Sequence, residues 1–125
     1  MKHYFMGNPL NKDERGEILD LLPDNPVIRT VMHITGKEGA LRASHYHLKD
    51  THYCYVLSGE IKYNYQTKSK GEIHSVVLHE GDCVFTPTME WHQFEFLTDG
   101  AFLAMATEAR TQDSYETDTI RTFLP

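Results

Sequence analysis

The chain has 125 residues, with 12 Lys and Arg against 18 Asp and Glu and a formal net charge of −6 at pH 7. This length matches one domain, and the acidic balance argues against nucleic acid or an anionic membrane surface as a partner. No apolar run approaches the roughly 20 residues that span a bilayer, and no signal-peptide stretch is present at the start. We therefore expect a cytoplasmic protein in which Cys54 and Cys83 are free thiols.

Short runs of β-branched and aromatic residues, bounded by Gly, Pro, Asp and Asn, predict an all-β chain. Many short strands at this spacing, without a helical apolar period, favour a sandwich or barrel. The polar tail is expected to form a turn of helix followed by an edge strand. In chain order, the predicted strands cover residues 17–22, 27–35, 40–47, 53–59, 60–66, 72–80, 82–87, 92–98, 101–108 and 119–124.

The chain contains eight histidines, and strand alternation indicates which of them can meet. Successive side chains point to opposite faces of a strand, so His45 and His47 share a face. If residues 48–50 turn the chain back, His52 lies beside that pair. His92 alternates with two phenylalanines, which predicts an inward position. A single inward histidine is usually a hydrogen-bonded core residue, but three or four neutral imidazoles converging in a mostly apolar cavity indicate a metal site.

The remaining histidines carry a weaker signal. His3, His74 and His79 are expected at the surface or at a sheet edge, and His33 is left unassigned. The metal itself is expected to be a divalent transition metal, namely Fe, Zn, Ni, Mn, Co or Cu, because these ions accept imidazole nitrogens.

The spacing of the histidines resembles the first of two motifs that characterise the cupin superfamily. That motif is Gly, five residues, His-x-His, three or four residues, Glu, six residues and Gly. His52 stands where the family usually has Glu. The chain matches the rest of the spacing at Gly39, His45, His47 and Gly59.

The second cupin motif is Gly, five residues, Pro-x-Gly, two residues, His, three residues and Asn. Two positions depart from this pattern, where Met89 replaces glycine and Phe96 replaces asparagine. The chain keeps the spacing at Gly81, Pro87 and His92. Two motifs in the right order make the resemblance specific for the fold.

The resemblance covers about residues 39–107 and implies a double-stranded β-helix, which is the jelly-roll barrel of a small single-domain cupin. We expect one domain over residues 1–125, with extra strands at 14–36 and a C-terminal extension at 108–125. The resemblance and the expected edge strands also imply a homodimer.

Cupins generally bind metal through the His-x-His pair, the Glu and the later His, so the resemblance implies His45, His47, His52 and His92 as ligands. Replacement of the carboxylate by His52 removes a negative charge, which favours metals that prefer nitrogen. If His52 instead swings away, a three-histidine face with open positions remains. Such a face resembles the cupin dioxygenases that hold non-haem iron with histidines alone.

A fainter resemblance links residues 13–22 and 39–47 to the nucleotide-sugar epimerases and ketoisomerases of the cupin superfamily. It implies that Arg42 contacts a substrate phosphate and that His45 acts as the base. Those enzymes generally work without metal, and one histidine cannot be a ligand and a free base in the same state. Alternation also places Arg42 opposite His45 unless a bulge intervenes.

We therefore expect a metal-binding cupin, namely a small-molecule metalloenzyme that isomerises or epimerises a keto, sugar-like or carboxylate metabolite. The alternatives are a non-haem iron dioxygenase with an all-histidine site and a non-catalytic metal- or ligand-binding cupin. Tyr63 and Tyr65 alternate on one strand and are candidates to face the cavity, where they would offer phenolic protons. Barrel packing explains both tyrosines equally well.

Overall fold

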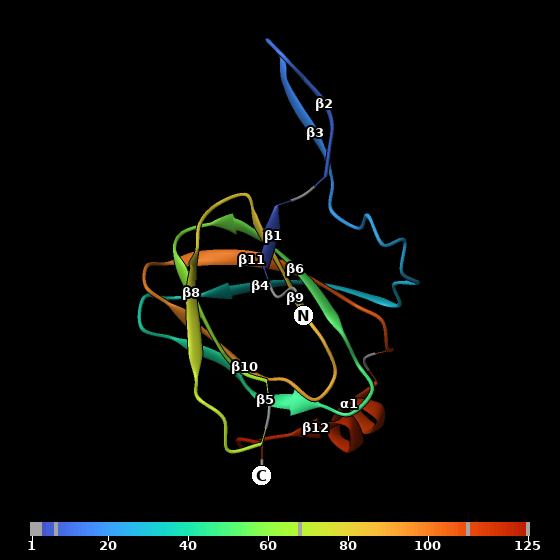
Figure 1. The fold of residues 1–125 in the computed structure, drawn as a ribbon, viewed down its shortest axis with the longest axis vertical. Coiled ribbons are helices and arrows are strands. Elements are labelled where there is room, and N and C mark those ends of the chain that lie inside the picture. The colour runs from blue at the N-terminus through green and yellow to red at the C-terminus, as the bar shows by residue number, and fades with distance from the viewer. Residues whose placement is uncertain (1–3, 7, 68, 110, 125) are drawn as a thin grey trace.

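The computed structural model describes residues 4–6, 8–67, 69–109 and 111–124, and most of its strands form two five-stranded antiparallel sheets that face each other (Figure 1). The first sheet has the order β1 (Tyr4–Met6), β9 (Asp82–Thr86), β6 (His52–Ser58), β11 (Gly100–Ala106) and β4 (Thr30–Gly36). The second has the order β12 (Thr119–Ile120), β5 (Leu41–His47), β10 (Trp91–Phe96), β7 (Ile61–Gln66) and β8 (His74–Leu78).

The hydrophobic core lies between the two sheets. Phe94 on β10 stacks on Phe102 on β11 with ring centroids 4.4 Å apart, so the contact joins one sheet to the other. A fully buried phenylalanine contributes about 1.5–3 kcal/mol, which makes such contacts the main source of stability. The fully buried members of this core are Cys54, Val56, Ile61, Tyr63, Leu78, Val84, Phe94, Phe96, Phe102 and Ala104.

The structure confirms the predicted all-β fold. The polar tail forms α1 (Gln112–Asp118) and then β12, as expected from the sequence. The prediction missed β1, and it also missed β2 (Asn8–Asp13), which pairs with β3 (Gly16–Asp20). The segment of β2 is rich in Asn, Asp and Pro, which are depleted in strands, so local propensity gave no signal.

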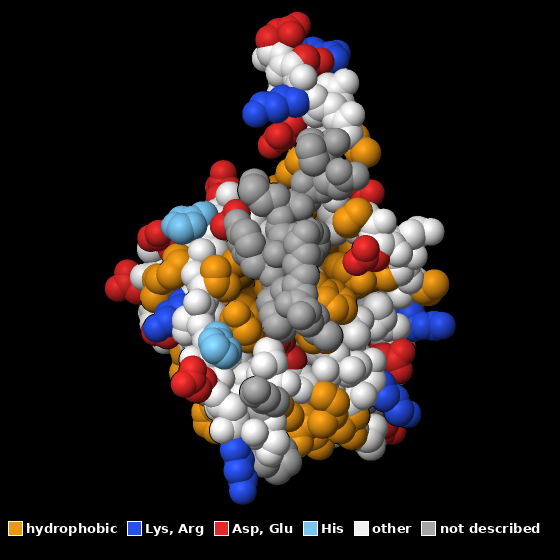
Figure 2. Space-filling view, viewed as in Figure 1, with side chains coloured by type: hydrophobic (Ala, Val, Ile, Leu, Met, Phe, Trp, Pro, Cys, Tyr) orange, Lys and Arg blue, Asp and Glu red, His pale blue; other side chains and the backbone are white. Residues whose placement is uncertain are grey.

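The β2–β3 hairpin projects away from the two sheets (Figure 1). Its tip is densely charged (Figure 2), and an ion pair joins Arg15 to Asp13 at 2.7 Å. Two large apolar side chains on the hairpin, Leu10 and Ile18, are 64% and 58% exposed. None of the helices in the described part of the chain is long and apolar enough to cross a membrane.

Gly59 and Met89, two positions of the cupin-like motifs, have a positive backbone φ angle. Gly59 has a φ of 83°, and a Cβ at this position would lie 2.5 Å from the carbonyl oxygen of Asp99. Glycine is therefore required at this turn between β6 and β7. Met89, which replaces the motif glycine, keeps a left-handed φ of 58° and so carries strain that glycine would avoid.

Candidate metal centre

The four histidines singled out from the sequence lie together at one end of the space between the sheets. The pairing of β5 with β10 places His45 opposite His92, with ring centroids 4.9 Å apart. The ring of His47 lies 4.6 Å from that of His45, and the ring of His52 lies 5.0 Å from that of His47. All four side chains are buried.

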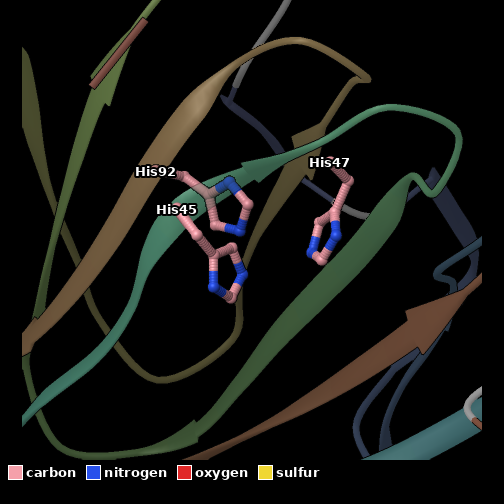
Figure 3. Close-up of side chains that lie close together, drawn as sticks. All are labelled: His45, His47 and His92. Carbon is pink, nitrogen blue, oxygen red and sulfur yellow. The ribbon is translucent and has the colours of Figure 1, made fainter. Parts of the chain in front are cut away.

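Three of these histidines form a group that can hold a metal ion. His45, His47 and His92 each offer one ring nitrogen, and the three nitrogens lie within 4.8 Å of one another. Figure 3 shows the three rings turned toward a common space. Three imidazoles at such separations are typical of sites for Zn and other nitrogen-preferring metals.

The protonation of His92 suits a ligand. Its Nδ1 lies 3.0 Å from the carbonyl oxygen of Glu90, and because a carbonyl only accepts, Nδ1–H donates. Nε2 is therefore left with its lone pair, and it is buried without a hydrogen-bond partner among the described residues. Burial and the neighbouring histidines hold the pKa of His92 well below its usual value, so the ring is neutral. These residues fit a divalent transition metal.

His52 makes a different contact. Its Nε2 lies 2.9 Å from Oδ2 of Asp50, and the carboxylate accepts the hydrogen bond. Burial alone would raise the pKa of Asp50, but the hydrogen bond and charge of His52 and the backbone N–H of Glu108 outweigh it, so that pKa is lowered. His47, Asp50 and His52 form a second group of possible ligands, which shares His47 with the first.

A bulge in β5 decides where Arg42 lies. Ala43 and Ser44 have φ values of 70° and 62°, and the pairing with β10 shifts by one residue between His45 and Ala43. The uninterrupted alternation that would separate Arg42 from His45 does not hold, because the extra residue returns Arg42 to the same face. Arg42 pairs with the inward Phe94 and lines the same cavity as His45.

That cavity has a volume of about 250 Å³. Its lining combines histidines and Arg42 with apolar side chains from β4, β10 and β11. The volume lies just below the roughly 300–1,000 Å³ of sites for drug-sized ligands, so it suits a small molecule. The lining residues other than Arg42 are Met32, Ile34, Ala43, His45, His52, His92, Phe94, Phe102, Ala104 and Tyr115.

A larger open hollow of about 610 Å³ adjoins the cavity at Arg42, which lines both. His33 and Lys37 also line the hollow, and Asp99 is its only acidic lining residue among the described residues. The guanidinium of Arg42 donates to the backbone carbonyl of Thr35 at 2.8 Å, which holds it between the two spaces. Despite the net negative charge of the chain, this surface favours an anionic group.

The two candidate tyrosines lie outside the cavity lining. Tyr63 is fully buried, and its hydroxyl donates to Glu90 Oε2 at 2.9 Å and lies 2.7 Å from Thr86 Oγ1. Burial raises the pKa of Glu90 to about 8, although the hydrogen bond from Tyr63 acts in the opposite direction. Tyr65 packs against Tyr63 and His74.

The other residues named from the sequence lie outside the group of buried histidines. Cys54 and Cys83 are both buried and are not joined by a disulfide bond, as expected. His33 and His74 are exposed, and His79 is an exposed partner of Glu60. His3 lies outside the described residues.

Sequence reasoning did not single out Asp50 or Tyr115 as site residues, although both adjoin the histidines. Asp50 lies two residues before His52, and this spacing at a tight turn could have predicted a hydrogen bond between the carboxylate and the imidazole. The sequence predicts a turn of helix in the tail, but no pattern in it indicates that this helix places Tyr115 beside the histidines.

A model of the cupin domain family matches residues 32–107. This range is more than half of the chain, and the chain therefore belongs to the cupin family. No curated protein sequence matched the chain.

Several solved structures share the fold over nearly the whole chain. A 3,4-ketoisomerase from Helicobacter canadensis has a TM-score of 0.77 at 18% identity, covering 94% of this chain and 88% of that one. A double mutant of the 3,4-ketoisomerase QdtA from Thermoanaerobacterium thermosaccharolyticum, in complex with TDP, has a TM-score of 0.76 at 25% identity, covering 95% and 86%. The TDP-quinovose 3,4-ketoisomerase WlaRB from Campylobacter jejuni has a TM-score of 0.77 at 19% identity, covering 98% and 95%.

Proposed function

We propose that this cupin is a metal-dependent isomerase or epimerase of a small keto sugar. The observation that carries the proposal is the group of three buried histidines within 4.8 Å of one another, two of which, His45 and His92, line a small cavity together with Arg42. Structural neighbours that isomerise sugars support the same reaction class.

We propose His45, His47 and His92 as the metal ligands. A metal held there would supply positive charge that polarises a carbonyl oxygen of the substrate. His52, the fourth ligand expected from the sequence, has its Nε2 on Asp50 instead. The distances therefore favour a separate task for His52.

That task is proton transfer. Isomerisation of a hydroxy-ketone moves a proton from the carbon next to the carbonyl, which needs a base within reach of the cavity. His52 lines the cavity, and Asp50 orients the ring by a hydrogen bond to one nitrogen. The apolar side chains that line the same cavity help to exclude water, which strengthens electrostatic interactions in the site.

The hollow beside Arg42 suggests a substrate with an anionic carrier. Lys37 and His33 accompany Arg42 there, and phosphate groups favour such cationic surfaces. QdtA has been solved in complex with TDP-4-keto-6-deoxyglucose. We propose a nucleotide-linked keto sugar of this kind as the substrate.

The test incubates the metal-loaded protein with TDP-4-keto-6-deoxyglucose and follows the sugar carbons and protons by NMR. Solvent deuterium should enter the carbon next to the carbonyl, and His52→Ala should abolish this exchange while the metal stays bound. Loss of the metal from His52→Ala would instead assign His52 as a ligand. No exchange with any of the six metals would contradict the isomerase proposal.

The absence of a carboxylate among the three proposed ligands favours one second candidate, a non-haem iron dioxygenase. Oxygen uptake by the Fe(II)-loaded protein with a keto or enol acid would support it. A protein that binds metal and shows neither activity would be the non-catalytic cupin.

We also propose a homodimer in the cytoplasm. An isolated two-stranded hairpin is at best marginally stable in water, and the β2–β3 hairpin exposes Leu10 and Ile18. A second copy of the chain would cover these apolar side chains. Sedimentation equilibrium should give a dimer mass for the wild type and a smaller mass for the double variant Leu10→Glu, Ile18→Glu.

A further inference from the structure

The C-terminal segment 108–120 lies outside the part of the chain that matches the cupin family, yet it forms part of the histidine cavity. Tyr115 on α1 is a lining residue of that cavity. Its ring centroid lies 6.3 Å from that of His45 and 6.1 Å from that of His47. The tail thus brings an aromatic side chain to two of the proposed metal ligands.

Both ends of this segment are fastened beside the site. At its start, the backbone N–H of Glu108 donates to Asp50 Oδ1 at 3.1 Å. At its end, the carboxylate of Asp118 accepts the backbone N–H of Lys49 at 2.7 Å, and Thr119 pairs with His47. A helix held at both ends by the residues around the histidines has a fixed position relative to them.

The ring of Tyr115 is also held from its own side of the tail. The guanidinium carbon of Arg121 lies 5.6 Å from the ring centroid, a cation–π distance. Arg121 in turn forms an ion pair with Glu116 at 2.9 Å. These contacts fix the ring between Arg121 and the two histidines. A tyrosine that only covered the surface of a short helix would not need contacts on both sides of its ring.

We propose that Tyr115 is a ligand-contacting residue that closes one side of the cavity and selects ligands by size. It lines a cavity of about 250 Å³ whose lining also includes Phe94 and Phe102. A planar or ring-shaped ligand bound at the histidines would lie against the Tyr115 ring. The inference deepens the proposed function and rests on it for the class of ligand, a small keto sugar.

A purely structural role for Tyr115 makes a different prediction. If the ring only anchors α1, its removal lowers the melting temperature and leaves access to the histidines in the folded protein unchanged. If the ring closes the cavity, its removal exposes His45 while the fold persists. Access to His45 is therefore the property to measure.

The first test uses metal-free protein and diethyl pyrocarbonate, which acylates accessible imidazoles, with peptide mapping by mass spectrometry. His45 should be acylated roughly tenfold faster in the Tyr115→Ala variant than in the wild type, and at the wild-type rate in Tyr115→Phe. Thr117→Ala, an exposed position on the same helix, is the matched control, and exposed His79 is the internal reference. Rates at His45 within twofold of each other in all four proteins would overturn the inference.

The second test measures selection. Tropolone, a flat chelating hydroxy-ketone, is titrated into Co²⁺-loaded protein and followed by the visible spectrum. Tyr115→Ala should raise the dissociation constant of tropolone by about two- to twelvefold, because aromatic contacts of this kind contribute about 0.5–1.5 kcal/mol. The affinity for Co²⁺ should stay within twofold. An unchanged tropolone affinity would overturn the inference, whereas failure of the wild type to bind Co²⁺ would sink the metal proposal and leave the acylation test to decide on Tyr115.

Discussion

The space between the two sheets has two ends of opposite chemical character, although the same strands form both. On β10, His92 lies at one end and Phe96 at the other, and on β6 the same holds for His52 and Val56. Phenylalanine stacking between the sheets fills one end. The other end buries ionisable groups, namely His45, His47, Asp50, His52, Glu90 and His92.

The contrast shows how this fold divides its tasks. Burial of apolar rings stabilises the folded chain, whereas burial of polar groups destabilises it unless each is hydrogen-bonded. Among the residues that the structure describes, the histidine end keeps at least one buried nitrogen, Nε2 of His92, without such a partner. A site that costs stability in this way is explained most directly by a function.

The largest expected effect comes from the apolar end. Phe102→Ala should lower the free energy of unfolding by about 3–5 kcal/mol, because it opens a cavity among stacked rings. Urea denaturation measures this loss. Val31→Ala, on an exposed position of β4, is the control and should stay within about 0.5 kcal/mol. A loss below about 1 kcal/mol for Phe102→Ala would contradict the assignment of the core.

The next largest effect is stabilisation by a metal ion, which depends on the histidine end and not on the hydrophobic core. Zn²⁺ at about 100 times its dissociation constant should stabilise the wild type by about 2.7 kcal/mol, since the metal binds only the folded site. His92→Gln should remove this gain, as seen in thermal melts with Zn²⁺ and with EDTA. His79→Gln, at an exposed histidine, should keep it. An equal gain in wild type and His92→Gln would show that Zn²⁺ binds elsewhere.

Glu90 gives the polar end a pH dependence. Burial raises its pKa to about 8, so the folded protein holds a proton that the unfolded chain releases near pH 4.5. The contribution of this proton to the free energy of unfolding is fully present below pH 4.5 and is lost as the pH rises toward 8. For the metal-free protein, the free energy of unfolding should fall by at most about 1.4 kcal/mol per pH unit in this range.

Denaturation at a series of pH values tests this expectation. Glu90→Gln should flatten the decline between pH 4.5 and 8, and Glu95→Gln, on the other face of β10, should leave it in place. The same decline in Glu90→Gln and wild type would place the responsible group elsewhere.

The smallest effect concerns the turn before β10. Met89 has a left-handed backbone, which a β-branched side chain tolerates poorly. Met89→Ile should be less stable than Met89→Gly by about 1–2 kcal/mol in the same denaturation assay. Equal stability of the two variants would mean that the turn relaxes without strain.

Much of this arrangement could be predicted from the sequence, because it follows from local periodicity. Alternation was enough to predict that His45 and His47 share a face and that His92 points inward, and clusters of Gly, Pro, Asp and Asn were enough to predict turns between the strands. These features depend on neighbours within one strand or on one motif.

The features that were missed depend on contacts between distant segments. The bulge at Ala43 and Ser44, which brings Arg42 to the histidine face, is set by pairing with β10 and leaves no trace in composition. Tyr115 reaches the cavity only because Asp118 fastens the tail near His47. Strand β2 lacks β-forming residues, and its pairing with β3 specifies it instead.

The most direct test of the metal site is elemental analysis of protein purified without chelators or a histidine tag, beside a His47→Ala variant prepared in parallel. The account predicts close to one transition-metal ion per wild-type chain and almost none in the variant. A His47→Ala protein with the full wild-type metal content, or a wild type that takes up none of the six metals on reconstitution, would contradict it.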